Sequence, residues 1–369
     1  MAYLKPIKVL ITGVGAPGIA GTLYSLKKNF DNRKVTTIGT DLKEEVVGKY
    51  LCDKFYKVVH PKEKDYIDVM LNICEKERID VLLPQTTAEL FKLSKHKKNF
   101  ENVGTKITIS DYEAIRIANN KLKLTEIFKK LKLPYPEFYL ASKFDELIEK
   151  AKKLGFPEKP VVIKPLESSG MRGLRVLYEG INLKRSFYED KPVSVSVEGR
   201  VPNSLFITSQ ALYSIIGDEF PELMVSEFLP GAEYSVDCFR TTYGKRMDII
   251  PRKRDLIRTG ITFYGTTEEN KEIIEYSRRI AEEINLKYMF GFQYKLDSEG
   301  TPKILESNPR IQGTMVLATF AGANVIYASI KHALDEKIPE FNIKWGTRIM
   351  RYWGGIGVLN GEKVHDIEL

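Results

Sequence analysis

The first third of the chain alternates short apolar runs with stretches of amphipathic spacing. The apolar runs have the length of buried strands, and the stretches between them repeat apolar residues at helical intervals. These features predict strands at 7–12, 35–41 and 81–84 and helices at 19–29 and 66–78. Strands that alternate with helices form a parallel sheet with helices on both faces. The pattern therefore predicts an α/β, Rossmann-like domain over residues 1–112.

The pattern changes after this domain. Residues 111–131 have the periodicity of one long amphipathic helix, which Pro134 and Pro136 end. From Val161 onward the predicted strands are longer and alternate apolar with polar residues, while helical spacing returns at about 203–216, 268–286 and 322–336. We therefore predict an α+β fold of two lobes, with a linker helix and small lobe at 113–225, a large lobe at 226–340 and a C-terminal segment at 341–369.

Composition narrows the classes of function. Hydrophobic residues make up 43% and charged residues 29% of the 369 positions, as in globular proteins with an apolar core. The sequence has neither a signal-peptide pattern nor an apolar run of membrane-spanning length, so we expect a cytoplasmic protein without a membrane partner. Its three cysteines form no C-x-x-C pair, which argues against structural disulfides and a zinc site. The net charge of +8 is interleaved with 49 acidic residues, so we expect no nucleic-acid partner.

A glycine-rich turn follows the first predicted strand. Residues 13–18 read GVGAPG, which fits G-x-G-x-x-G, and Asp41 ends the second strand. In a dinucleotide site such glycines let the backbone approach pyrophosphate, and the carboxylate receives the ribose hydroxyls. The same turn also occurs where a strand enters a helix without any cofactor. The motif therefore leaves an NAD(P)-dependent oxidoreductase open as an alternative.

A second motif combines a predicted hairpin with metal-ligand chemistry. The polar turn at 297–300 separates two predicted strands, which place Gln293 opposite Glu306. Asn308 lies two residues after Glu306, so both side chains lie on one face of the strand. Side-chain oxygens on one surface suit Mg²⁺, which takes oxygen ligands and keeps several waters or phosphate oxygens. Arg310 follows on the same face, where its planar fork can bind phosphate or carboxylate.

Two further segments can hold a nucleotide. Lys164 ends an apolar strand and is followed by the small-residue loop at 167–173, whose backbone amides can bind phosphate. The segment at 226–237 runs extended, breaks at a Pro-Gly pair and starts a new strand. Backbone groups exposed at such a break can pair with an adenine edge, and Glu233 can receive ribose hydroxyls. Alone, each segment is also compatible with an ordinary strand and turn.

Together these elements resemble the ATP-grasp superfamily, in particular the ATP-grasp unit of carbamoyl-phosphate-synthase large subunits and their stand-alone relatives. The resemblance covers nearly the whole chain and implies a Rossmann-like domain followed by a two-lobed ATP-grasp fold. It implies the following site residues: phosphate ligands Lys121, Lys164 and Arg310; loop residues Ser169, Gly170 and Gly173; adenine hinge Glu227, Phe228 and Leu229; ribose ligand Glu233; and magnesium or manganese ligands Gln293, Glu306 and Asn308. Most of the superfamily has a carboxylate where this chain has Gln293, whereas the carbamoyl-phosphate-synthase branch is similar in using Gln.

The resemblance also implies a reaction. An ATP-grasp ligase activates a substrate carboxylate as an acyl phosphate, releases ADP, and lets an amine or similar nucleophile displace phosphate. The basic segment at 252–260 carries four cations in seven positions, so it can bind an anionic substrate, and Arg258 is the expected anchor. Small-molecule substrates and a possible homodimer follow from the same resemblance. A non-catalytic, ATP-binding regulatory protein remains a second alternative.

Overall fold

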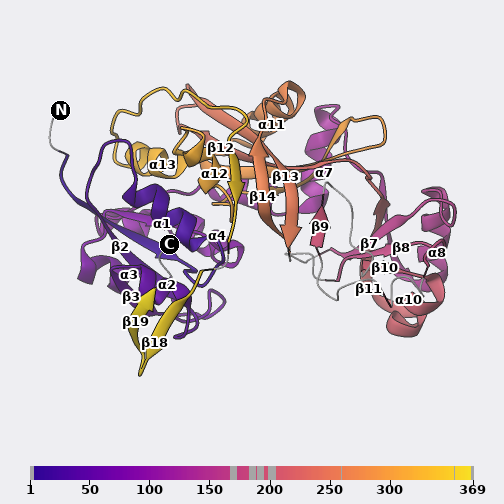
Figure 1. Ribbon diagram of the computed structural model, residues 1–369, viewed down its shortest axis with the longest axis horizontal. Helices are drawn as coiled ribbons and strands as arrows, with labels where there is room; N and C mark the ends of the chain where they lie inside the picture. Colours follow the sequence, from indigo (N-terminus) through magenta and orange to yellow (C-terminus); the bar gives the residue numbers. More distant parts are fainter. Residues whose placement is uncertain are drawn as a thin grey trace.

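The computed structural model describes residues 4–166, 173–182, 188, 195–197, 205–258, 260–352 and 354–366. The chain forms three main sheets that follow one another along the molecule. Figure 1 shows the N-terminal domain at one end and a small helix-covered sheet at the other, with a large sheet between them. Residues 167–172, which include Ser169 and Gly170, lie outside the described residues.

The N-terminal domain is a parallel sheet with the strand order β3-β2-β1-β4-β5. Its strands are β1 (Ile7–Thr12), β2 (Val35–Asp41), β3 (Lys54–Lys57), β4 (Val81–Leu83) and β5 (Lys106–Ile107). Its helices are α1 (Ile19–Lys27), α2 (Val47–Leu51), α3 (Tyr66–Glu77), η1 (Thr87–Glu89), α4 (Leu90–Lys95) and α5 (Lys97–Asn102). The strands and helices that hydrophobic spacing predicts in this region are therefore confirmed.

Side chains alternate between two apolar layers along β1. Val9 and Ile11 pack in the cluster that includes α1, whereas Leu10 packs in the cluster that includes α3. All three side chains are completely buried. Burial on both faces explains why this strand is continuously apolar rather than alternating.

The single helix predicted at 111–131 is wrong. The structure has α6 (Tyr112–Ala118) and α7 (Lys121–Lys130), with a break at two asparagines. The side chain of Asn120 caps α7 by accepting a hydrogen bond from the amide of Lys123 at 3.0 Å. Asparagine competes for backbone groups in this way and favours a helix start over a helix interior. Lys121 is therefore the first residue of α7, not the middle of a long helix.

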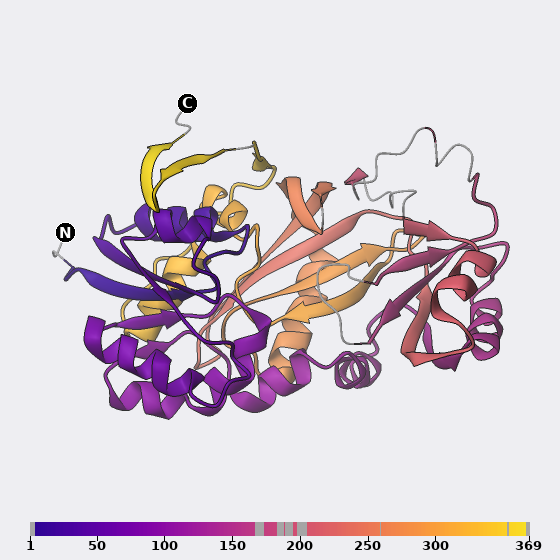
Figure 2. The same cartoon turned by 90° about the horizontal axis from the view of Figure 1, so that it is seen from below.

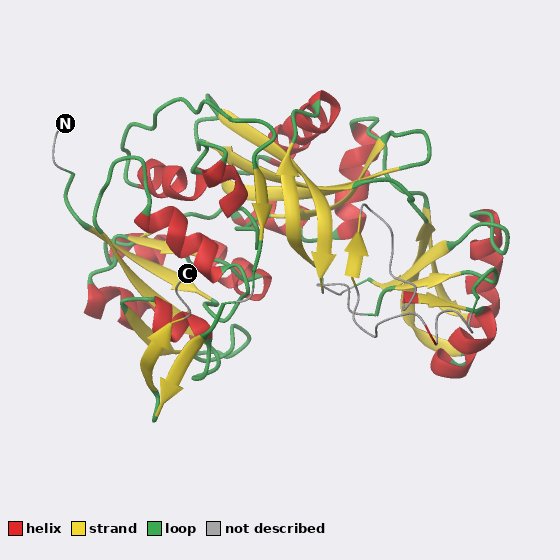
Figure 3. Cartoon of the chain, in the orientation of Figure 1, coloured by secondary structure: helices red, strands yellow, loops and turns green. Residues whose placement is uncertain are grey.

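The second sheet is small and has the order β10-β8-β7-β11-β6. Its strands are β6 (Phe138–Lys143), β7 (Val161–Pro165), β8 (Arg175–Leu177), β10 (Phe206–Ile207) and β11 (Glu219–Glu227). Two helices, α8 (Phe144–Lys153) and α10 (Ser209–Ile216), pack on its outer face, as Figure 3 shows. Val162, Val176 and Ser226, from three of its strands, line a cavity between this sheet and the large sheet.

The large sheet has the order β16-β15-β12-β13-β14-β17, and β9 also pairs with β13. Its strands are β9 (Val195–Val197), β12 (Glu233–Arg240), β13 (Met247–Arg258), β14 (Ile261–Thr267), β15 (Tyr288–Leu296), β16 (Pro302–Asn308) and β17 (Arg348–Met350). One face packs against α7 and α11 (Lys271–Ile284), and the other packs at one end against α13 (Val325–Ala333). The helix α12 (Val316–Phe320) connects the last strand of the hairpin to α13.

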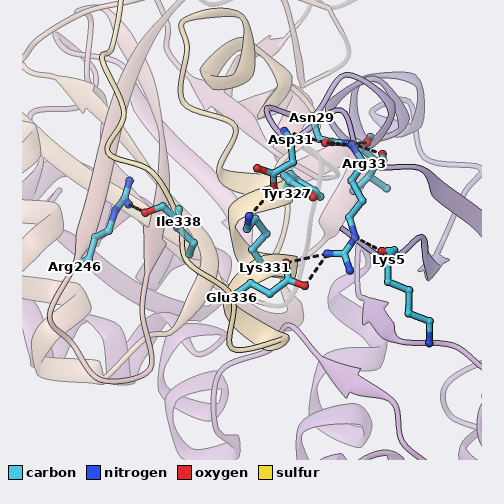
Figure 4. A network of polar contacts seen from close by, with 10 residues as sticks. Lys5, Asn29, Asp31, Arg33, Arg246, Tyr327, Lys331, Glu336 and Ile338 are labelled. Carbon is cyan, nitrogen blue, oxygen red and sulfur yellow. Dashed lines mark hydrogen bonds and ion pairs between the residues drawn. The ribbon is translucent and has the colours of Figure 1, made fainter. Parts of the chain in front are cut away.

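Polar contacts fix the N-terminal domain to the large sheet. Figure 4 shows Asp31 and Arg33, which follow α1, facing the end of α13. Lys331 donates to Asp31 at 2.5 Å, and Arg33 binds both carboxylate oxygens of Glu336 at 2.8 and 2.9 Å. Since Arg33 and Lys331 are both buried, these ion pairs lie in the interface between the two domains and not on the protein surface.

The described chain ends in an exposed hairpin. It consists of β18 (Ile356–Leu359) and β19 (Glu362–Asp366), which lie beside the N-terminal domain in Figure 2. Among the described residues, no helix combines the length and the apolar character needed to cross a bilayer.

Candidate active site

A cavity of about 210 Å³ lies between the small and the large sheet. Much of its wall is apolar and comes from both sheets: Val162, Leu174, Val176, Leu205, Phe228, Leu229, Ile257 and Leu305. Its polar lining includes Lys121, Lys164, Gln293 and Glu306. An apolar slot that ends in cations and a carboxylate suits a flat aromatic base attached to a charged chain.

Two lysines lie at the polar end of this first cavity. Lys164 comes from β7, and Lys121 from the start of α7, where its ammonium group donates to the carbonyl of Leu166 at 3.3 Å. The pKa of Lys164 is lowered to about 8, mainly by burial and also by the charge of Lys121, while Glu306 opposes both effects. Two cations held together in a partly buried place favour a polyanionic ligand between them.

The predicted adenine hinge lines the same cavity. Glu227 ends β11, and Phe228 and Leu229 follow it. The carboxylate of Glu227 accepts two hydrogen bonds from Lys303 at 2.7 and 2.8 Å, and its amide donates to the carbonyl of Glu137 at 2.8 Å. These contacts fix the strand end, so the segment that follows enters the cavity at a defined position.

Glu233, the expected ribose ligand, also lines the first cavity. Its carboxylate accepts a hydrogen bond from Arg254, which donates as well to Thr262 at 2.9 Å and to the carbonyl of Gly260 at 2.6 Å. Burial lowers the pKa of Lys295 nearby, against the opposing charge of Glu233. The carboxylate is therefore held by a buried arginine at the cavity wall.

The hairpin register brings the expected metal ligands together. Gln293 on β15 pairs directly with Glu306 on β16. The amide of Asn308 donates to Glu306 at 3.1 Å. Among the described residues no group of three or more His, Cys, Asp or Glu side chains could hold a metal. One carboxylate and two amides fit Mg²⁺, which often takes few protein ligands and completes its shell with phosphate oxygens and water.

Arg310 lies at the end of this hairpin and contacts the N-terminal domain. Its guanidinium donates to Asn308 at 3.0 Å and to the hydroxyl of Thr87 at 2.9 Å. Burial lowers the pKa of Arg310, whereas Glu306 and Glu89 raise it. Thr87 belongs to η1, whose capping box involves Thr86 and Glu89. No local sequence pattern indicates that this turn reaches Arg310, because the two are far apart in the chain.

A second cavity, of about 280 Å³, adjoins the first. Five residues belong to the lining of both cavities: Lys121, Arg254, Gly260, Gln293 and Glu306. The second is more polar, and it extends to residues that we did not select from the sequence: Thr87, Asn119, Ser235, Gln312 and Thr314. Arg252 also lines it, as part of the basic segment expected to bind substrate.

Two expected site residues lie apart from this arrangement. Arg258 is outside the described lining of both cavities, and its guanidinium lies 4.3 Å from the centre of the Phe263 ring. Gly173 has a φ of +72°, and a Cβ there would lie 2.7 Å from Pro165, so its backbone requires glycine. It is also absent from the described lining of the first cavity.

The glycine turn at 13–18 makes close contacts with other parts of the protein. The amide of Gly15 donates to the carboxylate of Asp41 at 2.7 Å. A Cβ at Gly18 would lie 2.8 Å from the Cα of Gly313, so this glycine allows two domains to pack closely. The turn and its carboxylate thus have structural roles that explain the motif without a dinucleotide.

Comparison with known proteins agrees with this geometry. Residues 219–351 match the family described as "ATP-grasp in the biosynthetic pathway with Ter operon", and residues 9–108 match the PylC-like N-terminal domain. The carbamoyl phosphate synthase large chain of Clostridium acetobutylicum is 23% identical over 353 residues, which cover 92% of this chain and 29% of the relative. That of Methanosarcina mazei is 25% identical over 329 residues, or 84% of this chain and 28% of the relative. The chain thus spans under a third of the length of these relatives.

Solved structures show the same fold. N5-carboxyaminoimidazole synthetase from Staphylococcus aureus, in complex with ADP, has a TM-score of 0.62 at 14% identity and covers 93% of this chain and 82% of its own. Biotin carboxylase from Campylobacter jejuni has a TM-score of 0.62 at 14% identity over 90% of this chain and 72% of its own. The predicted fold class and the resemblance to carbamoyl-phosphate-synthase large chains are confirmed: this chain carries an ATP-grasp domain behind a PylC-like N-terminal domain.

Proposed function

We propose that the protein is an ATP- and magnesium-dependent, ADP-forming ligase that activates a substrate carboxylate as an acyl phosphate. One observation carries the proposal: the two cavities meet at Lys121, Gln293 and Glu306. A nucleotide in the first cavity would place its terminal phosphate at this border. A carboxylate in the second cavity would then lie where it can attack that phosphate.

The residues that line the first cavity would each contact a different part of the nucleotide. The adenine would lie between the apolar walls beside Phe228 and Leu229, with Glu227 and Glu233 at its edge and near the ribose. Lys121 and Lys164 would bind phosphate oxygens, with the loop at 167–173, including Ser169 and Gly170, placed over them by the resemblance alone. Phosphoryl transfer depends on positioning and charge neutralisation, which these cations supply without a covalent nucleophile.

Gln293, Glu306 and Asn308 would hold Mg²⁺ or Mn²⁺, which neutralises phosphate charge when bound. Arg310 would bind the transferred phosphate or the attacking carboxylate, since it lies beside Asn308 and Thr87. A nucleophile, for which an amine is the expected class, would then displace phosphate. Because an acyl phosphate is hydrolysed by water, the cavities must be closed to solvent during the reaction.

The broader setting is also a proposal. The three cysteines are free thiols, which suits a reducing cytoplasm. A homodimer is proposed because a biotin carboxylase domain of the same fold was solved as a dimer with MgADP. The substrates would be small molecules, since both cavities are of that size.

The test is ADP release with Mg²⁺, ATP and pooled carboxylates, with hydroxylamine present to trap acyl phosphates as hydroxamates. Hydroxamate formation with one pool supports carboxylate activation. Thermal stabilisation by Mg-ATP without ADP release from any pool would favour a regulatory ATP-binding protein. Absence of any nucleotide effect would refute the proposal.

A further inference from the structure

Arg252 is the most deeply buried cation of the second cavity. Its side chain is 2% exposed, and Asp237 beside it is completely buried. Nε and Nη2 of Arg252 donate to the two oxygens of Asp237 at 2.7 and 3.1 Å, and Nη2 also donates to Gln312 at 2.9 Å. Nη1 has no hydrogen-bond partner in the part of the chain that the structure describes. A buried charged donor without a partner is costly, so it indicates a missing ligand or water.

The position of Arg252 follows from the sheet register. Direct pairing across four neighbouring strands sets one row of side chains along the cavity: Glu306, Gln293, Ser235 and Arg252. In the next row Asn308 pairs with Gly291, which pairs with Asp237. At ~4.8 Å per strand, Asp237 on β12 lies about 10 Å from β16, which carries Glu306 and Asn308, and about 5 Å from β15, which carries Gln293. Arg252 therefore lies beyond Gln293, on the side away from Glu306 and Asn308.

Gly291 permits this arrangement. A Cβ at Gly291 would lie 1.6 Å from Nε2 of Gln312, so only glycine lets the glutamine cross the sheet surface. Gln312 then reaches both Arg252 and the carbonyl of Val236, the latter at 3.3 Å. The guanidinium of Arg252 is held by the carboxylate of Asp237 and by the side-chain amide of Gln312. Its Nη1 makes neither of these contacts.

A second arginine, Arg351, lies behind the same wall and contacts its residues, although it is not in the described lining of the cavity. Arg351 donates to the carbonyls of Thr262 and Gly313 at 3.2 and 2.8 Å and to the hydroxyl of Thr314 at 3.4 Å. These three residues line the second cavity. Among the described residues Arg351 has no ion-pair partner. Burial lowers the pKa of Arg351, and the charge of Arg252 lowers it further.

Asp237 balances the charge of Arg252, whereas no described carboxylate pairs with Arg351. Glu306 is the one acidic residue in the described lining, and it lies at the metal end. The excess of positive charge at the far end therefore comes from Arg351, and Nη1 of Arg252 is a guanidinium donor without a described partner. Such a place favours an anion and disfavours an ammonium group.

We propose that the second cavity binds a dicarboxylate, with one carboxylate at the metal end for activation and the other bound by Arg252 beside Arg351. This inference rests on the proposed function, and it names the substrate class for the same site. A separation of about 10 Å between Asp237, which holds Arg252, and the strand of Glu306 and Asn308 is estimated from strand spacing, and it suits a chain of a few carbons once the contacts at each end are included.

The test is calorimetric binding of succinate, glutarate and adipate to the full chain with Mg-ADP present. Butyrate, valerate and hexanoate serve as monocarboxylates of equal length. The best dicarboxylate should bind at least about tenfold more tightly than its monocarboxylate partner, because a charged hydrogen bond contributes that much. Equal affinities within each pair would overturn the inference.

Variants then locate the effect. Arg351→Gln and the double change Arg252→Gln with Asp237→Asn, which avoids a buried unpaired carboxylate, should each remove the preference for dicarboxylates. Arg348→Gln removes the same charge from the exposed side of β17 and should leave the preference unchanged. A preference that survives in both test variants would also overturn the inference.

The two proposals fail in distinguishable ways. Mg-ADP binding is measured in the same experiment before any acid is added. If Mg-ADP binds and the acids show no preference, the dicarboxylate assignment is wrong and the ligase proposal stands. If Mg-ADP does not bind, the ligase proposal is wrong and the dicarboxylate assignment falls with it.

Discussion

The two cavities share a polar border but are built in different ways. The first lies between two sheets, has largely apolar walls, and collects its polar residues from segments that the sequence marks clearly. The second lies on one face of the large sheet and is completed by Thr87 from the N-terminal domain and by Gln312 and Thr314 after the hairpin. The proposed nucleotide site can thus be predicted from local motifs, whereas the proposed substrate site depends on how distant segments meet.

The largest expected effect is at the border that both cavities share. Glu306→Ala removes the one carboxylate among the expected metal ligands, so ADP release should fall by at least about 10³-fold. Glu299→Ala, in the exposed turn of the same hairpin, is the matched control and should keep normal turnover. Normal turnover in Glu306→Ala would show that the metal does not bind at this hairpin.

A smaller effect should be confined to the first cavity. Lys164→Ala removes one preorganised phosphate donor, which costs on the order of 3 kcal/mol of transition-state stabilisation, or roughly 10²-fold in kcat/KM for ATP. Affinity for the carboxylate, measured by calorimetry, should change little. Lys159→Ala, at an exposed position before the same strand, is the control. A loss of carboxylate affinity that exceeds the loss for ATP would show that the two cavities do not act separately.

The pH dependence of ATP binding should report the same lysine. Since the pKa of Lys164 is lowered to about 8, its ammonium group is charged below this pH and loses its proton as the pH rises above it. ATP affinity of the free protein should therefore fall between pH 7 and 9, by up to roughly tenfold. Titration calorimetry at both pH values checks this. Lys164→Arg keeps its charge throughout, so a decline of equal size in that variant would assign it to another group.

The smallest effect is expected at Arg258. The sequence points to this residue as the substrate anchor, but the structure leaves it outside the described lining of both cavities. Arg258→Ala should change the KM for the carboxylate by less than about threefold, in keeping with a contact outside the site. Steady-state kinetics with saturating ATP measures it. An increase above tenfold would return the anchoring role to Arg258 and weaken the case for Arg252.

Two sequence patterns have a different meaning in the structure from the one that the sequence alone suggests. Asn119 and Asn120 interrupt a stretch whose apolar periodicity alone predicts one helix, because periodicity does not register a side chain that caps a new helix. G-x-G-x-x-G fits a dinucleotide site, but Gly313 packs on the turn from a different domain. In both cases the sequence pattern is present, but its structural role depends on contacts that the pattern itself does not contain.

The sequence by itself determined the βαβ order, the hairpin that pairs Gln293 with Glu306, and the segments that form the first cavity. These features follow from short-range periodicity and from residues a few positions apart, which the chain specifies directly. Tertiary structure decided which arginine enters the second cavity, why Gly291 must lack a side chain, and how Thr87 reaches Arg310. These features depend on strand register and domain packing, since a side chain gains its partners only when distant segments fold against it.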